Sequence, residues 1–464
     1  MNLLIVAKQG ARTTAARNAS GMSDTIGYRA WPRAGANAES FASRELKAMK
    51  YLSGFFNRGL LGPALLLLTV QAGAQAGAQA GAQVGAQSPQ TSAAMAWQKF
   101  DSLPPVVGLD GKRHSATCSG FPGTDKKFSF WARRTGSKNT VVYFEGGGAC
   151  WDNLTCSFPM STAVPPEVPQ FFVPSIPADT DPATFDGIFK TDNPANPMRG
   201  WNMVYIPYCT GDLHTGSTTK RYFNVGNTAL PLPSTFPIEH RGFDNFMVVL
   251  DWMKKNMDAP RKVVVAGSSA GGYGATANFP WVRRAWPLAQ TYVIADASQG
   301  VTTPAFDTGN PGRNSWNMQL APWVFGDNPS LIAGPELMRM AAQGQPRARM
   351  AQFTTALDAV QISFYGVMKQ FYGPGGNCPD PTVDWYQQMS ATLQSYATDT
   401  PNYRYFLAAG DYHTLLRSPQ FYSESSPGIS FNTWTANMLA GGGTGSGAWA
   451  NSACETCLIP LPCP

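Results

Sequence analysis

Histidine, surplus charge and long apolar runs are scarce in this sequence, and each shortage narrows what the chain can do. Only four histidines occur among its 464 residues, so the search for a catalytic base is short. Residues 1–87 hold nine of the 35 Lys and Arg and three of the 29 Asp and Glu, which leaves 26 of each sign in the rest of the chain. This neutral remainder gives no electrostatic footprint for a polyanion, so no nucleic-acid partner is expected.

The apolar run Gly59–Val70 has the length of a signal-peptide core rather than that of a membrane span. Lys50 and Arg58 supply positive charge before it, and Ala72-Gly73-Ala74 follows as an A-x-A cleavage site. An uncleaved membrane anchor is the alternative. No second run is long enough to cross a bilayer, so the mature chain is expected to contain no integral membrane segment.

From Ala72 to Gln87 the chain repeats Ala-Gly-Ala-Gln, with Val84 as the one variant. This segment has neither charge nor large side chains, so it predicts a flexible tether. The predicted organisation is an upstream extension at 1–48, a signal peptide at 49–74, an Ala/Gly/Gln-rich linker at 75–95 and a catalytic domain at 96–464.

All eight cysteines lie after the leader. An even count in an exported chain predicts up to four disulfides and a secreted or periplasmic location. Cys150 and Cys156 flank a short loop and are a candidate pair. Cys454 and Cys457 form a C-x-x-C for which zinc is the alternative. No histidine lies nearby, and we expect no metal and no other cofactor.

A β-branched apolar run at 263–266 ends in Gly267-Ser268-Ser269-Ala270-Gly271, a G-x-S-x-G pentapeptide. A serine on a sharp strand-to-helix turn takes strained backbone angles, and flanking glycines avoid a clash there. The helix N-terminus behind the serine favours negative charge near its oxygen. We therefore interpret Ser269 as a nucleophile; an ordinary glycine-rich turn is the alternative.

A nucleophilic serine needs a base and a residue that orients the base. His413 is the one histidine that follows Ser269 in the chain, and it stands in a loop after the strand-like run 403–409. The α/β-hydrolases place serine, acid and histidine in that order along the chain. His413 is therefore the predicted base, with a surface loop histidine as the alternative.

The acid is expected at the end of a strand between Ser269 and His413. Asp358 follows the second expected strand after the serine, which is the usual position in α/β-hydrolases, and we prefer it. Asp296 closes the first of these strands and is the main alternative. Three further carboxylates remain open, namely Asp307, Asp380 and Asp384, whereas Asp411 is read as a turn residue.

Three consecutive glycines, Gly146 to Gly148, follow the expected strand at 140–144. Their backbone is free to approach a tetrahedral intermediate and to point N–H groups at its oxyanion. Ala270, the residue after the proposed nucleophile, supplies the second kind of donor. A flexible turn is the alternative, but a glycine loop paired with a later G-x-S-x-G is more specific than either motif alone.

Continuous apolar runs separated by helical segments predict a mostly parallel, doubly wound α/β sheet with helices on both faces and long loop insertions, the α/β-hydrolase fold. The proposed catalytic residues then fall at the carboxyl ends of strands, where open α/β sheets bind ligands. Strands are expected at 140–144, 203–207, 262–266, 291–295, 350–357 and 403–408, and a helix at 244–257.

Several segments together resemble the pectin acetylesterase/Notum family over roughly residues 115–415. The glycine loop with its cysteines, Phe144–Trp151 and Cys156, is similar to that family's loop, and 268–274 resembles its serine turn. The segments 208–212 and 240–245 are also similar. The resemblance implies that Ser269, Asp358 and His413 form the triad and that the N–H groups of Gly147, Gly148 and Ala270 form the oxyanion hole.

The expected activity is that of an exported serine esterase that hydrolyses O-acetyl or other short acyl esters, with a polysaccharide or polymer as a partner. Ala149 stands where many family members carry an aromatic residue in the acyl pocket. Candidate substrate contacts are Trp151, Tyr208 and His214. The alternatives are a secreted hydrolase of polyhydroxyalkanoate or oxidised poly(vinyl alcohol), and a catalytically inactive binding protein on the same fold.

Overall fold

The structure is a computed structural model that describes residues 96–161, 163–164, 168–308, 313–376, 378–440, 449–455, 457 and 463. The predicted upstream extension, signal peptide and linker lie outside the described residues.

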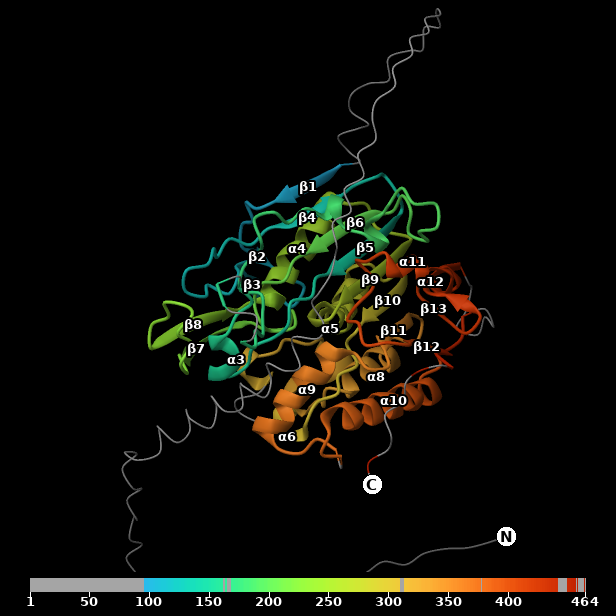
Figure 1. The fold of residues 1–464 in the computed structure, drawn as a ribbon. Coiled ribbons are helices and arrows are strands. Elements are labelled where there is room, and N and C mark those ends of the chain that lie inside the picture. The colour runs from blue at the N-terminus through green and yellow to red at the C-terminus, as the bar shows by residue number, and fades with distance from the viewer. Residues whose placement is uncertain are drawn as a thin grey trace, which may run out of the picture.

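A large sheet forms the centre of the described chain. Its strands are β1 (Trp97–Phe100), β4 (Phe130–Arg133), β5 (Asn139–Phe144), β6 (Asn202–Ile206), β9 (Lys262–Ser268), β10 (Gln290–Asp296), β11 (Arg349–Thr355), β12 (Tyr403–Ala408) and β15 (Ser452–Ala453). Their order across the sheet is β1-β4-β6-β5-β9-β10-β11-β12-β15, and the labels from β4 to β12 can be followed in that order in Figure 1. The strands from β6 to β15 are parallel, whereas β4 and β1 pair antiparallel at one edge.

Successive side chains along a strand point to opposite faces of the sheet, and in the central strands both sets are apolar, so both faces are buried. In β9, Val263 and Val265 belong to one core cluster, whereas Val264 and Ala266 belong to a second cluster on the opposite face. The first cluster includes residues of five helices, α4 (Gly242–Asn256), α5 (Ala270–Ala285), α8 (Glu336–Gln343), α9 (Ala359–Tyr372) and α10 (Pro381–Asp399). The second includes residues of α11 (Gln420–Ser423) and α12 (Phe431–Ala440). Helices therefore cover both faces of the sheet, as predicted.

The helices are α3 (Asn153–Ser157), α4 (Gly242–Asn256), α5 (Ala270–Ala285), α6 (Pro304–Thr308), α7 (Pro322–Phe325), α8 (Glu336–Gln343), α9 (Ala359–Tyr372), α10 (Pro381–Asp399), α11 (Gln420–Ser423) and α12 (Phe431–Ala440). Short 3₁₀ helices are η1 (Pro182–Thr184), η2 (Gly187–Phe189), η3 (Arg313–Trp316) and η4 (Pro329–Leu331). Three small hairpins consist of β2 (Val106–Val107) with β3 (Arg113–His114), β7 (Thr218–Phe223) with β8 (Thr235–His240), and β13 (Ser425–Ser426) with β14 (Ile429–Ser430).

The predicted strands are confirmed with small changes at their ends. The largest changes are of two residues: β9 continues to Ser268 rather than ending at 266, and β11 ends at Thr355 rather than at 357. Strand β11 ends early because the N–H of Leu357 donates to the carbonyl of Gly410 instead of continuing the ladder. The predicted helix at 244–257 is α4, which begins two residues earlier at Gly242.

The coarse prediction of a mixed α/β fold with a large, mostly parallel sheet is confirmed. All eight cysteines are joined in disulfides, and the predicted pair Cys150–Cys156 is one of them. The other pairs are Cys118–Cys209, Cys378–Cys463 and Cys454–Cys457. In the part of the chain that the structure describes, no helix has both the length and the hydrophobicity that crossing a membrane requires.

Candidate active site

Ser269 stands between the last residue of β9 and the first residue of α5. Its backbone has φ 57° and ψ −127°, a region that L-residues rarely adopt. Two hydrogen bonds hold this turn: the N–H of Ser269 donates to the carbonyl of Asp296 at 2.7 Å, and the N–H of Gly272 donates to the carbonyl of Ser269 at 2.9 Å. The chain therefore makes the sharp strand-to-helix turn that the pentapeptide predicts.

The glycines around Ser269 are required by close backbone contacts. A Cβ atom at Gly271 would collide with the carbonyl oxygen of Phe144 on the neighbouring strand β5. A Cβ at Gly267 would collide with the carbonyl of Gly271. The strand, the turn and the helix approach one another more closely than any side chain at these two positions would permit.

The glycine loop after β5 lies against the serine turn. Gly148 has φ +70°, and a Cβ there would collide with the carbonyl of Phe171. The segment 171–173 forms hydrogen bonds to the residues on either side of Gly148. The N–H of Ala149 donates to the carbonyl of Phe171, and the N–H of Val173 donates to the carbonyl of Gly147. Both partners come from the long loop after α3, which therefore holds the glycines in place.

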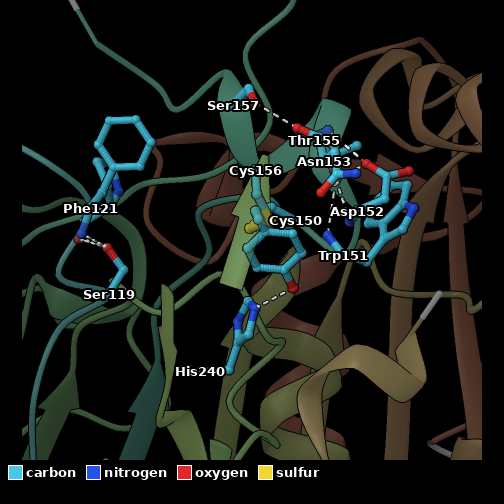
Figure 2. The surroundings of a disulfide bond; sticks show 12 residues. Ser119, Phe121, Cys150, Trp151, Asp152, Asn153, Thr155, Cys156, Ser157 and His240 are labelled. Carbon is cyan, nitrogen blue, oxygen red and sulfur yellow. Dashed lines mark hydrogen bonds between the residues drawn. A yellow bond between two sulfur atoms is a disulfide. The ribbon is translucent and has the colours of Figure 1, made fainter. Parts of the chain in front are cut away.

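A disulfide fixes the far end of the glycine loop (Figure 2). Cys150 and Cys156 bracket the start of α3, which Asp152 and Thr155 close in a capping box: the Asp152 carboxylate accepts from the N–H of Thr155, and the Thr155 hydroxyl accepts from the N–H of Asp152. The sulfurs also lie close to a ring nitrogen of His240. Since they are bonded to each other, they offer this cluster no thiolate for a metal.

His413 contacts the preferred acid. Its Nδ1 atom lies 2.9 Å from each carboxylate oxygen of Asp358, which is fully buried. Asp358 is the N-cap of α9, and its carboxylate also accepts hydrogen bonds from the backbone and side-chain N–H groups of Gln361. The acid is therefore fixed by its own helix, and it fixes the imidazole in turn.

The surroundings of His413 favour its protonated form. Burial alone would lower the pKa of His413, but the Asp358 carboxylate, assisted by that of Asp296, outweighs burial and raises this pKa above its usual value. The second ring nitrogen, Nε2, is buried and has no hydrogen-bond partner among the described residues. With Nδ1 bonded to Asp358, Nε2 is the nitrogen left to exchange a proton with a reactant.

The other carboxylates that the sequence left open are engaged elsewhere. Asp296 accepts hydrogen bonds from Ser268 and from the histidine loop, and Asp307 accepts from Thr302. Asp380 caps α10, and Asp384 pairs with Lys369. Among the acids considered, Asp358 is thus the one hydrogen-bonded to His413.

Ser269 and His413 line the same cavity, which encloses about 90 Å³. Most of its wall is apolar, and the residues come from the glycine loop, from the segment 297–318 and from α9. They include Ala149, Trp151, Phe306, Trp316, Phe364 and Met368.

A wider pocket of about 560 Å³ meets the first cavity at Ser269, His413 and Gly148. Its other walls carry more polar groups, among them Arg417 and Gln420. Ser269 therefore stands between a small, mostly apolar cavity and a larger pocket with a greater share of polar groups.

The sequence-proposed substrate contacts fall in different places. Trp151 lines the apolar cavity. Tyr208 and His214 are both about 1% exposed and are not among the residues that line either pocket. Tyr208 accepts a hydrogen bond from the N–H of Leu213, and His214 Nε2 donates to the carbonyl of Glu145 at 2.8 Å. Burial lowers the pKa of His214 to about 4, which leaves it neutral beneath the glycine loop.

Sequence reasoning missed most of the cavity wall. Phe306 lies in the short helix α6, Met318 lies in an irregular segment, and Phe364 and Met368 lie on one face of α9. Apolar residues at spacing four on a helix carry no signal that separates a cavity wall from ordinary core. Arg417, four residues after His413, pairs with Glu145 beside the glycine loop and was also not singled out.

Residues 109–309 match the model of a protein family described as Pectinacetylesterase, which confirms the resemblance carried by the glycine loop and the serine turn. The matched segment includes Ser269 and the three loop glycines and ends before Asp358 and His413.

Similar proteins include the palmitoleoyl-protein carboxylesterase notum1 of Xenopus laevis, which is 29% identical over 145 residues, or 31% of this chain and 26% of that protein. The mouse palmitoleoyl-protein carboxylesterase NOTUM is 26% identical over 35% of this chain and 30% of its own. Pectin acetylesterase 4 of Arabidopsis thaliana is 24% identical over 39% of this chain and 40% of its own. The chain therefore spans about a quarter to two fifths of the length of these relatives.

Proposed function

We propose that this protein is an exported serine carboxylesterase related to the pectinacetylesterases and built on the α/β-hydrolase fold. One observation carries the proposal: Ser269 and His413 line one cavity, and His413 offers it an unpartnered Nε2 while Asp358 holds Nδ1. The names of the relatives, carboxylesterases and an acetylesterase, support the same reaction class.

In the proposed reaction, Nε2 of His413 takes the proton of the Ser269 hydroxyl as its oxygen attacks the ester carbonyl. The Asp358 carboxylate holds the imidazole in the required tautomer and stabilises the imidazolium. The N–H groups of Gly147, Gly148 and Ala270 stabilise the oxyanion of the tetrahedral intermediate. Its collapse breaks the ester C–O bond, His413 returns the proton to the leaving alcohol, and water then releases the acid from the acyl-enzyme by the same steps.

The two pockets suggest how an ester would lie across the serine. The apolar cavity suits the acyl group, because hydrocarbon gains most from leaving water. The larger pocket, whose walls include Arg417 and Gln420, suits the alcohol part, such as a sugar or a longer polymer chain. Ala149 forms the cavity wall next to the glycine loop, and we propose that acetyl to butyryl esters are preferred, with O-acetylated polysaccharide as the substrate class.

Export rests on the predicted signal peptide at 49–74 and agrees with the four disulfides, which persist in oxidising compartments. Mass spectrometry of the mature protein tests it directly. An N-terminus at or shortly after Gln75 with no free thiol supports export, and a full-length protein with eight free thiols contradicts it.

The experiment for the function compares the wild type with Ser269→Ala on p-nitrophenyl acetate. The variant should lose about 10⁴-fold or more in kcat and keep its melting temperature. Ser395→Ala, on an exposed position of α10, is the matched control and should keep full activity. Residual activity above a few per cent in Ser269→Ala would refute the assignment. Acetylated polysaccharide tested beside polyester film then separates the deacetylase from the polymer hydrolase.

A further inference from the structure

A second buried carboxylate, that of Asp296, lies between the serine turn and the histidine loop. Asp296 is the last residue of β10 and is fully buried. Its Oδ2 atom accepts hydrogen bonds from the Ser268 hydroxyl at 2.6 Å and from the N–H groups of Leu415 and Leu416 at 3.0 Å each. One carboxylate oxygen thus joins the residue before Ser269 to residues two and three positions after His413.

The central sheet places this carboxylate. Asp296 pairs directly with Ser268 in the parallel ladder of β10 and β9. Its carbonyl accepts the N–H of Ser269, and the hydroxyl of Tyr143 on β5 donates to Ser268 at 2.9 Å. Three adjacent strands therefore fix Asp296, whereas the histidine loop depends on Asp296 for two of its backbone hydrogen bonds.

The histidine loop needs such support because its conformation is strained. Thr414, directly after His413, has φ +70°, which costs a non-glycine residue of order 1 kcal/mol or more. Two other interactions hold the histidine loop. The Thr355 hydroxyl donates to the carbonyl of Tyr412 at 2.8 Å, and Arg417 forms an ion pair with Glu145. The bonds to Asp296 are the ones that reach the serine turn itself.

Charge adds a second effect. The titratable groups whose charge acts on His413 are Asp358 and Asp296, and both raise its pKa. The titratable groups that interact electrostatically with Asp296 are His413 and the phenols of Tyr143 and Tyr412. Burial raises the pKa of Asp296 to about 6, so the carboxylate is ionised at neutral and alkaline pH.

We propose that Asp296 is a positioning residue for the esterase reaction, which locks the loop carrying His413 against the serine turn and places a second negative charge near its imidazole. The inference rests on the proposed function, since positioning matters only if His413 serves Ser269. It assigns Asp296, the main alternative acid in the sequence, a distinct role beside Asp358.

The test is Asp296→Asn, assayed with p-nitrophenyl acetate across pH 5 to 9. Loss of the charge-assisted bonds should lower kcat by about 10- to 100-fold with little change in KM, because small displacements of a reacting group cost that much. Loss of the charge should move the acidic limb of kcat/KM to lower pH by about 0.5 unit. An unchanged kcat together with an unmoved limb would overturn the proposal.

Thr355→Val is the matched control. It removes the hydrogen bond from the Thr355 hydroxyl to the histidine loop but keeps the shape of the side chain and the charge of Asp296. The kcat should therefore fall, and the acidic limb of kcat/KM should not move. If Asp296→Asn does not fold, Asp296→Glu replaces it. That variant keeps the charge but displaces it, so its kcat should fall while the limb stays in place. Full kcat in Asp296→Glu would then overturn the proposal.

A measurement that does not need activity separates this inference from the function. The chain has four histidines, so nitrogen-15 labelling of histidine and NMR titration give the pKa of His413, assigned with His413→Gln. In Asp296→Asn this pKa should be lower than in the wild type. If the wild type hydrolyses no ester, the proposed function fails, and the titration still decides whether Asp296 acts on His413.

Discussion

A Cβ atom at Gly146 would lie 2.8 Å from the Cβ of Ser269 and 2.6 Å from the carbonyl oxygen of Ser268. The glycine loop thus rests on the serine turn, although β5 and β9 are separated by more than 100 residues of chain. The two motifs are one structural unit, because a side chain at Gly146 would collide with the serine turn and one at Gly271 would collide with the carbonyl of Phe144 at the end of β5.

Gly146→Ala should therefore damage turnover more than stability. The new methyl group must push the glycine loop away from Ser269, which misplaces the proposed oxyanion donors; loss of one such donor costs about 10²- to 10³-fold in kcat. Steady-state kinetics with p-nitrophenyl acetate and thermal melting measure the two effects. Gly366→Ala in α9 is the control, because its Cβ would meet nothing closer than 3.8 Å. Equal activity of the two variants would contradict this reading of the loop.

Asp358→Asn should keep the fold and lower kcat by about 10³- to 10⁴-fold, since an amide at this position favours the wrong tautomer of His413. Asparagine remains a good N-cap, so α9 should keep its start. Asp380→Asn, which changes the N-cap of α10 in the same way, is the matched control and should retain wild-type kinetics. If Asp358→Asn lost no more than tenfold, Asp358 would not be the orienting acid.

Ala149→Trp should shift acyl preference toward acetyl, because a large ring at this wall fills the apolar cavity beside Trp151 and Phe364. Each methylene in a fitted pocket changes discrimination by about 1–3 kcal/mol. A series of p-nitrophenyl esters from acetyl to palmitoyl measures kcat/KM for both proteins. Leu331→Trp, at a position that is 77% exposed, is the control. A wild-type maximum at octanoyl or longer would contradict the short-acyl proposal and favour the long acyl group in the relatives' names.

His114 predicts a pH dependence of stability that is independent of the active site. The ring is 2% exposed, and its nitrogens lie 2.6 Å from Asp244 and 2.8 Å from Asp110. Burial opposes protonation, but hydrogen bonds to the two carboxylates raise the pKa of His114 above 6.5. A raised folded-state pKa means that the stabilisation is complete below pH 6.5 and is lost as pH rises through the folded-state value.

His114→Gln should therefore lower the unfolding free energy most at pH 5 to 6, by about 3 kcal/mol, which is typical of breaking a buried pair. The deficit should shrink toward pH 9, and urea unfolding at several pH values measures it. The stability contribution of His240 should depend on pH in the opposite direction, since burial lowers the pKa of His240 to about 4. Its contribution is complete above pH 6.5 and is lost on acidification. A deficit for His114→Gln that does not vary with pH would show that the ring is neutral in the fold.

The predictions from sequence were most accurate where backbone geometry or burial restricts which residues can stand at consecutive positions. The serine turn and the glycine loop are recognisable because glycine alone avoids the backbone collisions found at Gly148 in the loop and at Gly267 and Gly271 in the turn. The strands were recognisable because a sheet covered on both faces needs continuous apolar runs. The Cys150–Cys156 pair followed from a separation of six residues, whereas the partner of Cys118, 91 residues away, had no local signal.

The sequence by itself determined the serine turn, the glycine loop, the strand order along the chain and the family resemblance. Tertiary structure alone decided which carboxylate meets His413, which apolar side chains enclose the cavity, and that Asp296 bridges the two loops. In the sequence, Asp296 and Asp358 each follow an expected strand, and only the usual strand position in α/β-hydrolases favoured Asp358. Their roles differ because strand order and the path of the histidine loop bring the Asp358 carboxylate to Nδ1 of His413 and that of Asp296 to backbone N–H groups two and three residues later. Contacts between residues so far apart in the chain arise from packing of the whole sheet, and no local pattern encodes them.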